Sequence, residues 1–535
     1  MSSLRELPVV FVDCQATGAS PAHGAVMELG WAVGDGEVVS QLTAVPEGTE
    51  LTHWVRRVTG ITQKHLRDAP PVERVWRALE ALGPAHAVIH FATYEDKFLR
   101  DLHERFSADR DFPFELLCTH EIARRRLPDL PRRGLRALAG YFGHNVGNLR
   151  RSADHVAATR LVWRSLVDEL EAIDVGTLTD LRAWLEETPR GKAKARGWPM
   201  PESERAELPD APGVYRMLRV DGSLLYVGKA RSLKKRVRSY FTKSTKRAIP
   251  ERTLEMLSQA RRLDVTRTET PLEAALLEQE EIKARSPRYN VALVADERSV
   301  WFASPRLDSI REAPDARHVV GPVGDAQVLA EVPALVAALR GDPSARPTLL
   351  SATWGPQGER LRAGIAVFAR RHPEVPLTRR GLLWLGRALW PRARDRGGDD
   401  APIDEHWRAE TVADVIEDAL VRAAHVTRRA RWLVVLSEAS LAWDEGDRTR
   451  LLVFERGTVE SRDWLEHGTL PPCPPGYARS KAARRRSFDV TTRDRLRVLT
   501  TELRRLVTDG AAPRIRTGPG NLIHGDALGR LLHWV

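Results

Sequence analysis

Hydrophobic and polar positions over the first 175 residues alternate between strand-like and helix-like periods. A continuous apolar run at residues 9–12 is typical of a buried strand. Further strand patterns fall at residues 26–33, 38–42 and 88–90. Helical spacing of apolar side chains is found at residues 72–82, 94–106, 119–126, 135–142 and 153–170. This mixture predicts an α/β domain over residues 1–175.

The middle of the chain begins with a hairpin pattern. Residues 214–218 and 224–228 are mostly apolar, and Asp221-Gly222 between them is a turn signal. A basic helix is expected at residues 231–240, and a second helix at residues 272–283. These elements predict a small α/β domain over residues 206–295.

Residues 176–205 have the composition of a connector. A helix is expected at residues 177–187, followed by a stretch rich in proline, glycine and basic residues at 188–201. Its basic side chains either contact the phosphate backbone of a nucleic acid or belong to an ordinary solvated linker.

Residues 296–535 predict a further mixed α/β region. Helical spacing occurs at residues 327–340, where Pro333 is a candidate kink, and at 377–389, 411–424 and 491–507. Apolar runs at residues 432–436 and 450–454 indicate strands, and residues 455–459 a hairpin turn. The last helix has leucines on one face and arginines on the other. The arginine face either contacts the phosphates of a nucleic acid or is an ordinary solvated face.

Composition narrows the class of protein. A chain of 535 residues is long enough for about three domains. Its formal net charge of +11 favours a polyanionic partner, with nucleic acid the natural one, although solubility charge explains it equally well. The three cysteines are far apart, and neither a signal peptide nor a membrane span of about 18 apolar residues is visible. A cytoplasmic protein without membrane contact is therefore expected.

The central hairpin and its helices bring together the groups that phosphodiester hydrolysis needs. Tyr215 and Tyr226 lie on the two strands, Lys229 precedes the basic helix, and Arg236 lies on it. Glu278 on the second helix supplies a carboxylate for a hard divalent cation. The alternative is that the tyrosines are core aromatics and Glu278 lies on a solvated helix face.

The order of these motifs resembles the GIY-YIG nuclease family, and most of all the N-terminal nuclease of UvrC and its short homologue Cho. The matching segments are GVY at 213–215, YVGKA at 226–230, LKKRVRSYF at 233–241, EAALLE at 273–278 and PRYNV at 287–291. The resemblance implies that Glu278 holds one Mg²⁺ or Mn²⁺ and that Arg236 contacts the scissile phosphate. Tyr226 or Tyr215 would help to deprotonate water, and Lys229 would steady the site. Nucleic-acid contacts are expected from Lys234, Lys235 and Arg238.

The N-terminal region resembles the DnaQ-like 3′–5′ exonucleases of the DEDDh type, which implies an RNase H-like fold. The matching segments are FVD at 11–13, TG at 17–18, MELG at 27–30, VTGIT at 58–62, and the surroundings of His90 and Asp154. The family has four carboxylates around two metal ions, with a histidine as general base. Of these, Asp13 and Asp154 are in register, whereas the other expected positions hold Gln15, Glu95 and Leu149.

These departures predict a degenerate exonuclease site. Gln15 carries no charge, Glu95 has a longer arm than aspartate, and Leu149 cannot accept a proton. His155 follows Asp154 directly, so on a helix it points about 100° away and is expected to be a poor substitute. The domain is expected to hold DNA or a partner protein; the alternative is an active enzyme with unusual ligands.

The whole chain is therefore expected to be a cytoplasmic endonuclease of DNA repair, related to nucleotide excision repair. The central domain would nick damaged or branched DNA, and UvrA/UvrB-like proteins are candidate partners. The resemblance to UvrC ends near residue 295, so the role of residues 296–535 stays open between DNA and partner contact. Two alternatives are an active 3′–5′ exonuclease and a non-enzymatic DNA-binding scaffold.

Overall fold

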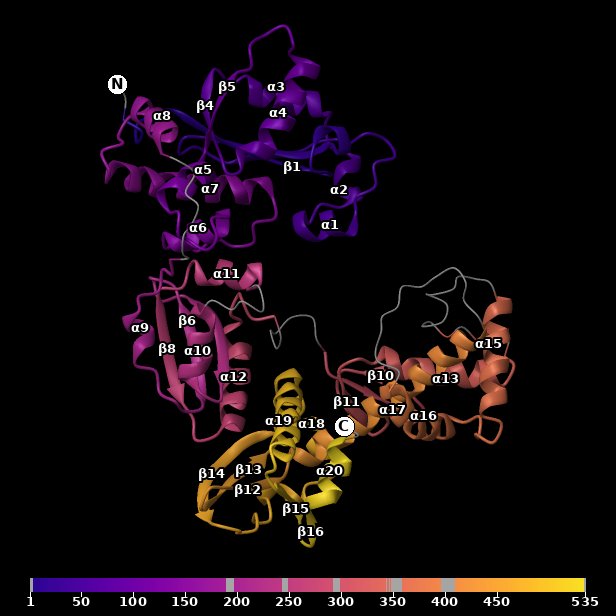
Figure 1. The fold of residues 1–535 in the computed structure, drawn as a ribbon. Helices are drawn as coiled ribbons and strands as arrows, with labels where there is room; N and C mark the ends of the chain where they lie inside the picture. The colour runs from indigo at the N-terminus through magenta and orange to yellow at the C-terminus, as the bar shows by residue number, and fades with distance from the viewer. Residues whose placement is uncertain are drawn as a thin grey trace. The chain divides into compact units, whose positions relative to one another are not determined.

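The computed structural model describes residues 3–188, 197–242, 249–291, 299–342, 344–345, 347, 358–395 and 409–533. The chain divides into two compact units. Unit 1 consists of Met1–Arg267 and Pro287–Val291, and unit 2 of Thr268–Ser286 and Ala292–Val535. Each unit has its own sheets and cores, and Figure 1 labels their helices and strands. The basic part of the predicted connector, residues 189–196, lies outside the described residues.

The first sheet of unit 1 has the strand order β3-β2-β1-β4-β5. Its strands are β1 (Val9–Ala16), β2 (Val26–Val33), β3 (Val39–Leu42), β4 (Ala85–Ile89) and β5 (Phe114–Cys118). Strands β1, β2 and β3 are antiparallel neighbours, whereas β4 runs parallel to β1 and to β5. The helices are α1 (His53–Thr59), α2 (Gln63–Arg67), α3 (Val72–Glu80), α4 (Ala92–Phe106), α5 (Thr119–Arg126), α6 (Leu135–Tyr141), α7 (Ser152–Glu171) and α8 (Leu178–Glu187).

Helices cover both faces of this sheet, which explains the continuous apolar run of β1. Val9 and Phe11 belong to the core that α5, α6 and α7 share. Val10 and Val12, on the opposite face, belong to the core of α3 and α4. A strand buried on both faces must be apolar at consecutive positions rather than at alternate ones. The predicted α/β class is therefore confirmed for this region.

The hairpin sheet of unit 1 has the strand order β7-β6-β8, with all pairs antiparallel. Its elements are β6 (Gly213–Leu218), β7 (Leu224–Ala230), β8 (Arg262–Arg267), α9 (Ser203–Ala206), α10 (Leu233–Phe241) and α11 (Glu251–Leu257). Gly222 turns the hairpin with φ of 80°, a conformation that glycine adopts without strain. Ser232 begins α10 by accepting a hydrogen bond from the Lys235 backbone N–H.

Unit 2 begins with α12 (Pro271–Arg285), whose apolar face joins the C-terminal core. Leu272 and Leu276 pack in one cluster with Leu496, Leu499 and Leu503 of α19 (Val490–Thr508). Buried ion pairs link α12 to its own unit, from Glu273 to Arg450 at 2.5 Å and from Lys283 to Asp494 at 2.8 Å. The predicted helix is thus confirmed, and its core partners lie in the C-terminal region.

The rest of unit 2 combines two antiparallel sheets with a group of helices. The small sheet has the order β10-β9-β11, and the larger one β14-β13-β12-β15-β16. Its strands are β9 (Trp301–Ala303), β10 (Ile310–Arg311), β11 (Val320–Val323), β12 (Ser440–Glu445), β13 (Arg448–Glu455), β14 (Thr458–Glu466), β15 (Arg514–Gly518) and β16 (Asn521–Ile523). The remaining helices are α13 (Gln327–Leu339), α15 (Gly358–Arg371), α16 (Arg379–Asp395), α17 (Ala409–Leu436), α18 (Lys481–Arg486) and α20 (Gly525–His533).

One predicted strand of the C-terminal region is wrong. Residues 432–436 form the last turns of α17, which is 28 residues long, and the strand that follows is β12. Trp432, Leu433, Val434 and Leu436 are all buried, so the apolar run reflects a helix end enclosed by neighbours. A short apolar run does not distinguish a buried strand from a buried helix segment. Across the described residues, no helix has the length and apolar character needed to cross a membrane.

Candidate functional sites

Tyr215 lies at the centre of a hydrogen-bonded group in the hairpin part of unit 1. Its side chain, on β6, is completely buried. The Tyr215 hydroxyl lies 2.8 Å from the Tyr240 hydroxyl and accepts a hydrogen bond from Arg236 Nε at 3.3 Å. Arg236 Nη2 also donates to the Tyr240 hydroxyl at 3.2 Å, and its guanidinium lies 4.9 Å from the centre of that ring. The strand and α10 thereby hold two phenols and one cation together.

Electrostatics fix the protonation states in this group. Burial, followed by the neighbouring Tyr240 and Tyr226, raises the pKa of Tyr215 well above its usual value of 10. Burial opposes the charge on Arg236, but Tyr215 and Tyr240 outweigh it and raise the pKa of the guanidinium. At neutral pH Tyr215 is therefore a neutral hydroxyl and Arg236 a cation. Such a phenol positions a partner by hydrogen bonding and is a weak proton acceptor unless a nearby cation lowers its pKa.

Position 228 in β7 has room for glycine alone. In the structure a side chain at position 228 would collide with the Tyr215 hydroxyl and with the Tyr226 ring. The Tyr215 and Tyr226 ring centres are 6.0 Å apart. Gly228 therefore makes room for the two aromatic rings that face each other across the hairpin.

The remaining basic residues of this part differ in exposure. Lys229 at the end of β7 and Lys234 at the start of α10 are half-buried, whereas Lys235 and Arg238 are exposed. Lys235 Nζ lies 3.8 Å from an Asp210 carboxylate oxygen, and the lysine side chain is still accessible to solvent. Tyr240 was missed as a site residue in the sequence, although it stands four positions after Arg236 and so shares its helix face.

Glu278 lies on α12 and therefore belongs to unit 2. Its side chain is half-buried, between the buried Leu276 and Gln279. A carboxylate at a partly exposed helix position is a hard oxygen donor of the kind that Mg²⁺ accepts together with water molecules. The chemistry of this single donor fits a divalent cation. Glu278 belongs to unit 2 and the Tyr215 group to unit 1.

A second cluster of predicted residues surrounds a cavity of about 570 Å³ in the exonuclease-like part of unit 1. Asp13 and Glu95 are both nearly buried there. The two oxygens of Asp13 have separate partners, because Gln15 Nε2 donates to Oδ2 and His155 Nδ1 lies against Oδ1, each at 3.1 Å. Leu149 contributes apolar surface to the same cavity. Two exposed aromatic rings that sequence reasoning missed, Trp54 and Phe91, also line it.

The structure exchanges the expected positions of Asp154 and His155. Asp154 is exposed, and its Oδ2 accepts hydrogen bonds from the backbone N–H groups of Arg150 and Arg151 at 3.2 and 3.1 Å. It therefore closes the first turn of α7, and the next residue, His155, points into the cavity. The two side chains do diverge along the helix, as expected, but the one that reaches Asp13 is His155.

Packing of α7 against β2 sets this register. Gly30 allows Ser152 to approach so closely that any side chain at position 30 would collide with it. The completely buried Glu28 accepts hydrogen bonds from Arg151 Nη2 at 2.5 Å and from the Ser152 backbone N–H at 3.0 Å. Ser40 also donates to Glu28, at 2.7 Å. A buried carboxylate that accepts hydrogen bonds from three residues anchors the start of the helix.

The cavity carries less negative charge than four carboxylates would supply. Burial, followed by the charge of Asp13, raises the pKa of Glu95 well above its usual 4.5, and the Glu95 Oε2 atom is buried without a hydrogen-bond partner. Burial disfavours the charged form of His155, but Asp13 outweighs it and raises the pKa of the imidazole. Among the residues that the structure describes, no group of three or more histidine, cysteine, aspartate or glutamate side chains is arranged to hold a metal ion. The residues do not fit a two-metal centre.

Comparison with known proteins agrees with both parts of this description. Residues 10–157 match the exonuclease family, and residues 211–291 match the UvrC-like GIY-YIG domain. The chain is therefore a nuclease by class, with an exonuclease fold followed by a GIY-YIG domain. It belongs to the family of a Mycobacterium tuberculosis protein named "Putative bifunctional exonuclease/endonuclease protein", with which it is 30% identical over 499 residues, covering 88% of this chain and 75% of that protein.

Two further similarities concern the GIY-YIG segment. The UvrABC system protein C of Stenotrophomonas maltophilia is 56% identical over 91 residues, which are 17% of this chain and 14% of that protein. The magnesium-bound N-terminal endonuclease domain of UvrC from Thermotoga maritima is 32% identical, with a TM-score of 0.15, and the match covers 17% of this chain and 94% of that one.

Proposed function

We propose that this chain is a metal-dependent endonuclease that nicks damaged or branched DNA during repair, with the chemistry in its GIY-YIG domain. The observation that carries the proposal is the buried Tyr215 hydroxyl, held between Arg236 and Tyr240. A cation beside a neutral phenol is suited to bind the scissile phosphate and to orient the attacking water. The net charge of +11 and the relatives that are named nucleases also support DNA as the partner.

Glu278 is the residue that would hold the divalent cation. A bound Mg²⁺ or Mn²⁺ supplies Lewis-acid stabilisation of charge on the phosphate. The magnesium found in the Thermotoga UvrC domain supports Mg²⁺ as the first choice, and Mn²⁺ is the alternative to be tested. In this scheme Arg236 binds a phosphate oxygen, Tyr215 fixes the guanidinium, and Tyr226 and Lys229 complete the surroundings. Lys234, Lys235 and Arg238 contact the DNA backbone beyond the reacting group.

The exonuclease-type domain is proposed to bind DNA without cutting it efficiently. The Gln15 amide and the His155 imidazole engage both oxygens of Asp13, and these contacts compete with metal binding. Trp54 and Phe91 offer exposed rings on which a frayed base can stack. We assign residues 1–175 to the exonuclease-type domain, 176–205 to the linker, 206–295 to the GIY-YIG domain and 296–535 to the C-terminal region.

UvrA/UvrB-like loaders are candidate partners, since the GIY-YIG segment at residues 211–291 matches UvrC.

A second candidate is an active 3′–5′ exonuclease. It is favoured by the orphaned Glu95 Oε2 beside Asp13, because a buried carboxylate oxygen without a partner is open to a cation or a water molecule. It also agrees with the name of the M. tuberculosis relative.

The test is a cleavage assay on supercoiled plasmid, intact and ultraviolet-damaged, with Mg²⁺ or Mn²⁺. Wild type, Glu278→Gln and Asp13→Ala are compared side by side. We expect nicking to fall by about 10³-fold in Glu278→Gln and to stay within about threefold of wild type in Asp13→Ala. Mononucleotide release that disappears only in Asp13→Ala would establish the exonuclease instead. DNA binding without cleavage under any metal would instead support a non-enzymatic DNA-binding scaffold.

A further inference from the structure

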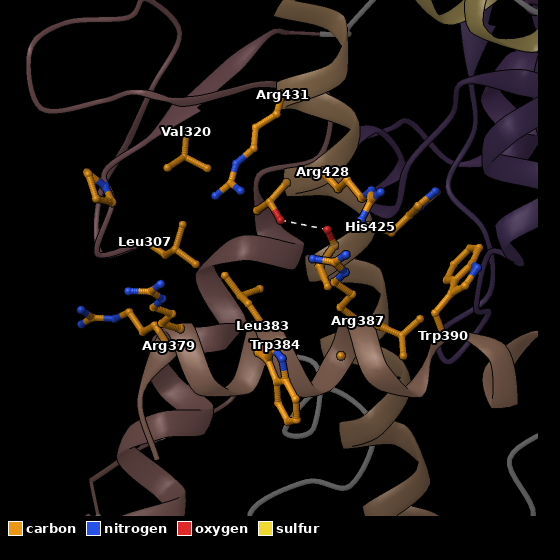
Figure 2. A pocket seen from close by; sticks show the side chains of 16 residues that line it. Leu307, Val320, Arg379, Leu383, Trp384, Arg387, Trp390, His425, Arg428 and Arg431 are labelled. Atoms are coloured by element: carbon orange, nitrogen blue, oxygen red, sulfur yellow. Dashed lines mark hydrogen bonds between the residues drawn. The ribbon is translucent and has the colours of Figure 1, made fainter. Parts of the chain in front are cut away.

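A concave cavity in unit 2 is lined by arginines. It lies where α16, α17 and the loops of the small sheet meet, and it has a volume of about 590 Å³. Figure 2 shows Arg428 and Arg431 on α17, and Arg379 and Arg387 on α16, around this space. With Arg380 they make five arginines, and none of the sixteen residues that line the cavity is acidic. We refer to this site as the arginine cavity.

The arginines that line this cavity repel one another. Burial, followed by the charges of Arg387 and Arg431, lowers the pKa of Arg428. Helix α16 begins at Arg379, so Arg379 and Arg380 lie at the positive end of the helix dipole, where cations are disfavoured. Like charges held together against repulsion are stabilised when an anion binds between them.

The basic surface continues beyond this cavity. A second cavity of about 490 Å³ shares Trp390 and His425 with the first, and these two rings stack with centres 4.7 Å apart. Arg429 and Arg504 line the second cavity. Burial, followed by the charges of Arg497, Arg504 and Arg493, lowers the pKa of Arg429 to about 10. Two adjoining cavities with the same charge suit an extended polyanion better than a single small anion.

An exposed aromatic ring completes the chemistry. Trp384 of α16 lines the arginine cavity and is 62% exposed, which is unusual for the largest apolar side chain. Figure 2 places its indole on the α16 side of the site. Basic grooves with accessible aromatic rings are how proteins hold single strands, because bases stack on the rings while cations neutralise phosphates. In duplex DNA the bases are stacked inside and are not available to Trp384.

We propose that the arginine cavity binds single-stranded DNA, with Arg387 and Arg431 contacting phosphates and Trp384 stacking on a base. This gives residues 299–533 a role in holding one strand of an opened or branched substrate. The binding itself requires no catalytic step, so it stands or falls independently of the proposed nicking activity.

The test measures binding of the full chain to a fluorescein-labelled oligothymidylate of about 10 nucleotides by fluorescence anisotropy. EDTA is present throughout, so that cleavage plays no part and a failure of binding is distinguishable from a failure of catalysis. The double variant Arg387→Gln/Arg431→Gln removes two exposed cations from the cavity. Arg422→Gln removes one exposed cation from the same helix but outside the lining, and serves as the control.

We expect the double variant to bind about tenfold more weakly and to lower the slope of log K against log salt by about 1.4. Trp384→Ala is expected to weaken binding about fivefold or more, and Arg422→Gln by less than about twofold. An equal loss in Arg422→Gln, or no loss in the double variant, would overturn the proposal. It would equally be overturned by tighter binding of a duplex of the same length, or by full displacement with ATP or dTMP at the oligonucleotide's own half-saturating concentration.

Discussion

The two nuclease-type regions of unit 1 treat their functional side chains in opposite ways. In the exonuclease-type cavity, the two carboxylate oxygens of Asp13 contact Gln15 and His155. Burial, followed by the charge of Asp13, raises the pKa of Glu95 and so favours its neutral form. In the hairpin region Arg236 donates hydrogen bonds to the hydroxyls of Tyr215 and Tyr240, and no carboxylate among the described residues is paired with its charge. A site whose charges are neutralised internally has little left for a metal or a phosphate, whereas a held but uncompensated cation is prepared to bind an anion.

This difference teaches that a fold match and a site match are separate observations. The five-stranded sheet of the exonuclease-type domain forms with the expected strands, although Gln15 and Leu149 stand where the resemblance leads us to expect catalytic groups. Core packing maintains the sheet: Phe11 and Val12 of β1 lie in the cores on its two faces, whereas the cavity residues Gln15 and His155 belong to neither core. A fold can therefore hold different polar side chains in its cavity.

The largest expected effect comes from Arg236→Ala. Removing the guanidinium takes away the cation that we propose to bind the scissile phosphate, so the single-turnover nicking rate should fall by about 10²-fold or more at saturating DNA. Arg238→Ala, on the same helix, is the control. It should raise the DNA concentration needed for half-maximal rate while leaving the saturated rate within about threefold. Equal rate losses in both variants would remove the distinction between a reacting and a binding arginine.

A smaller effect is expected from Tyr215→Phe. This change keeps the buried ring and deletes the hydroxyl that links Arg236 to Tyr240. The nicking rate should fall about tenfold because the guanidinium loses one of its two fixed partners. Tyr240→Phe, which removes the other partner, should produce a similar loss, and the double variant should cost less than the sum. Full additivity in this double-mutant cycle would show that the two hydroxyls act independently.

Arg151→Ala tests what holds the exonuclease-type domain together. The change removes two of the four donor groups of the buried Glu28, Arg151 Nε and Nη2, and leaves the Ser152 backbone N–H and the Ser40 hydroxyl. Helix α7 should therefore lose about 2–3 kcal/mol of local stability. Hydrogen exchange of Ser152–Glu171 in the full chain reports this loss directly. Arg164→Ala, on the same helix, breaks only an exposed ion pair with Asp35 and should change the opening free energy by about 0.5 kcal/mol or less. Nicking should be unchanged in both.

Sequence patterns were sufficient for the central hairpin and for most helices of unit 1, because their apolar spacing is regular and their turns contain glycine. They were insufficient where one residue of register decides which side chain faces a cavity. Asp154 and His155 are neighbours, and the hydrogen bonds of Asp154 to the first turn of α7 direct His155 towards Asp13. In the same way, long-range packing decided that residues 432–436 end a helix. The cavity that Trp54 lines and the arginine cavity are each assembled from side chains far apart in the sequence. No local sequence pattern reveals such a site.

The smallest effect concerns the pH dependence of the His155–Asp13 pair. Asp13 raises the pKa of His155 in the folded chain despite the opposing effect of burial, and the Leu149 carbonyl and Asp154 act in the same direction. A raised folded pKa means that the pair stabilises the fold fully below the unfolded value of about 6.5, and that this contribution is lost as the pH rises through the folded pKa. The expected loss is about 1 kcal/mol or less.

Hydrogen exchange of α7 across this pH range, corrected for intrinsic exchange rates, measures the contribution. His155→Asn keeps a side-chain donor near Asp13 but cannot titrate, so the decline in opening free energy towards alkaline pH should disappear. His144→Asn is the matched control, because His144 lies against the Ser165 hydroxyl at 3.0 Å, and its replacement should leave the decline in place. A decline that persists in His155→Asn would assign it to another group and would contradict the internally neutralised cavity on which the comparison of the two regions depends.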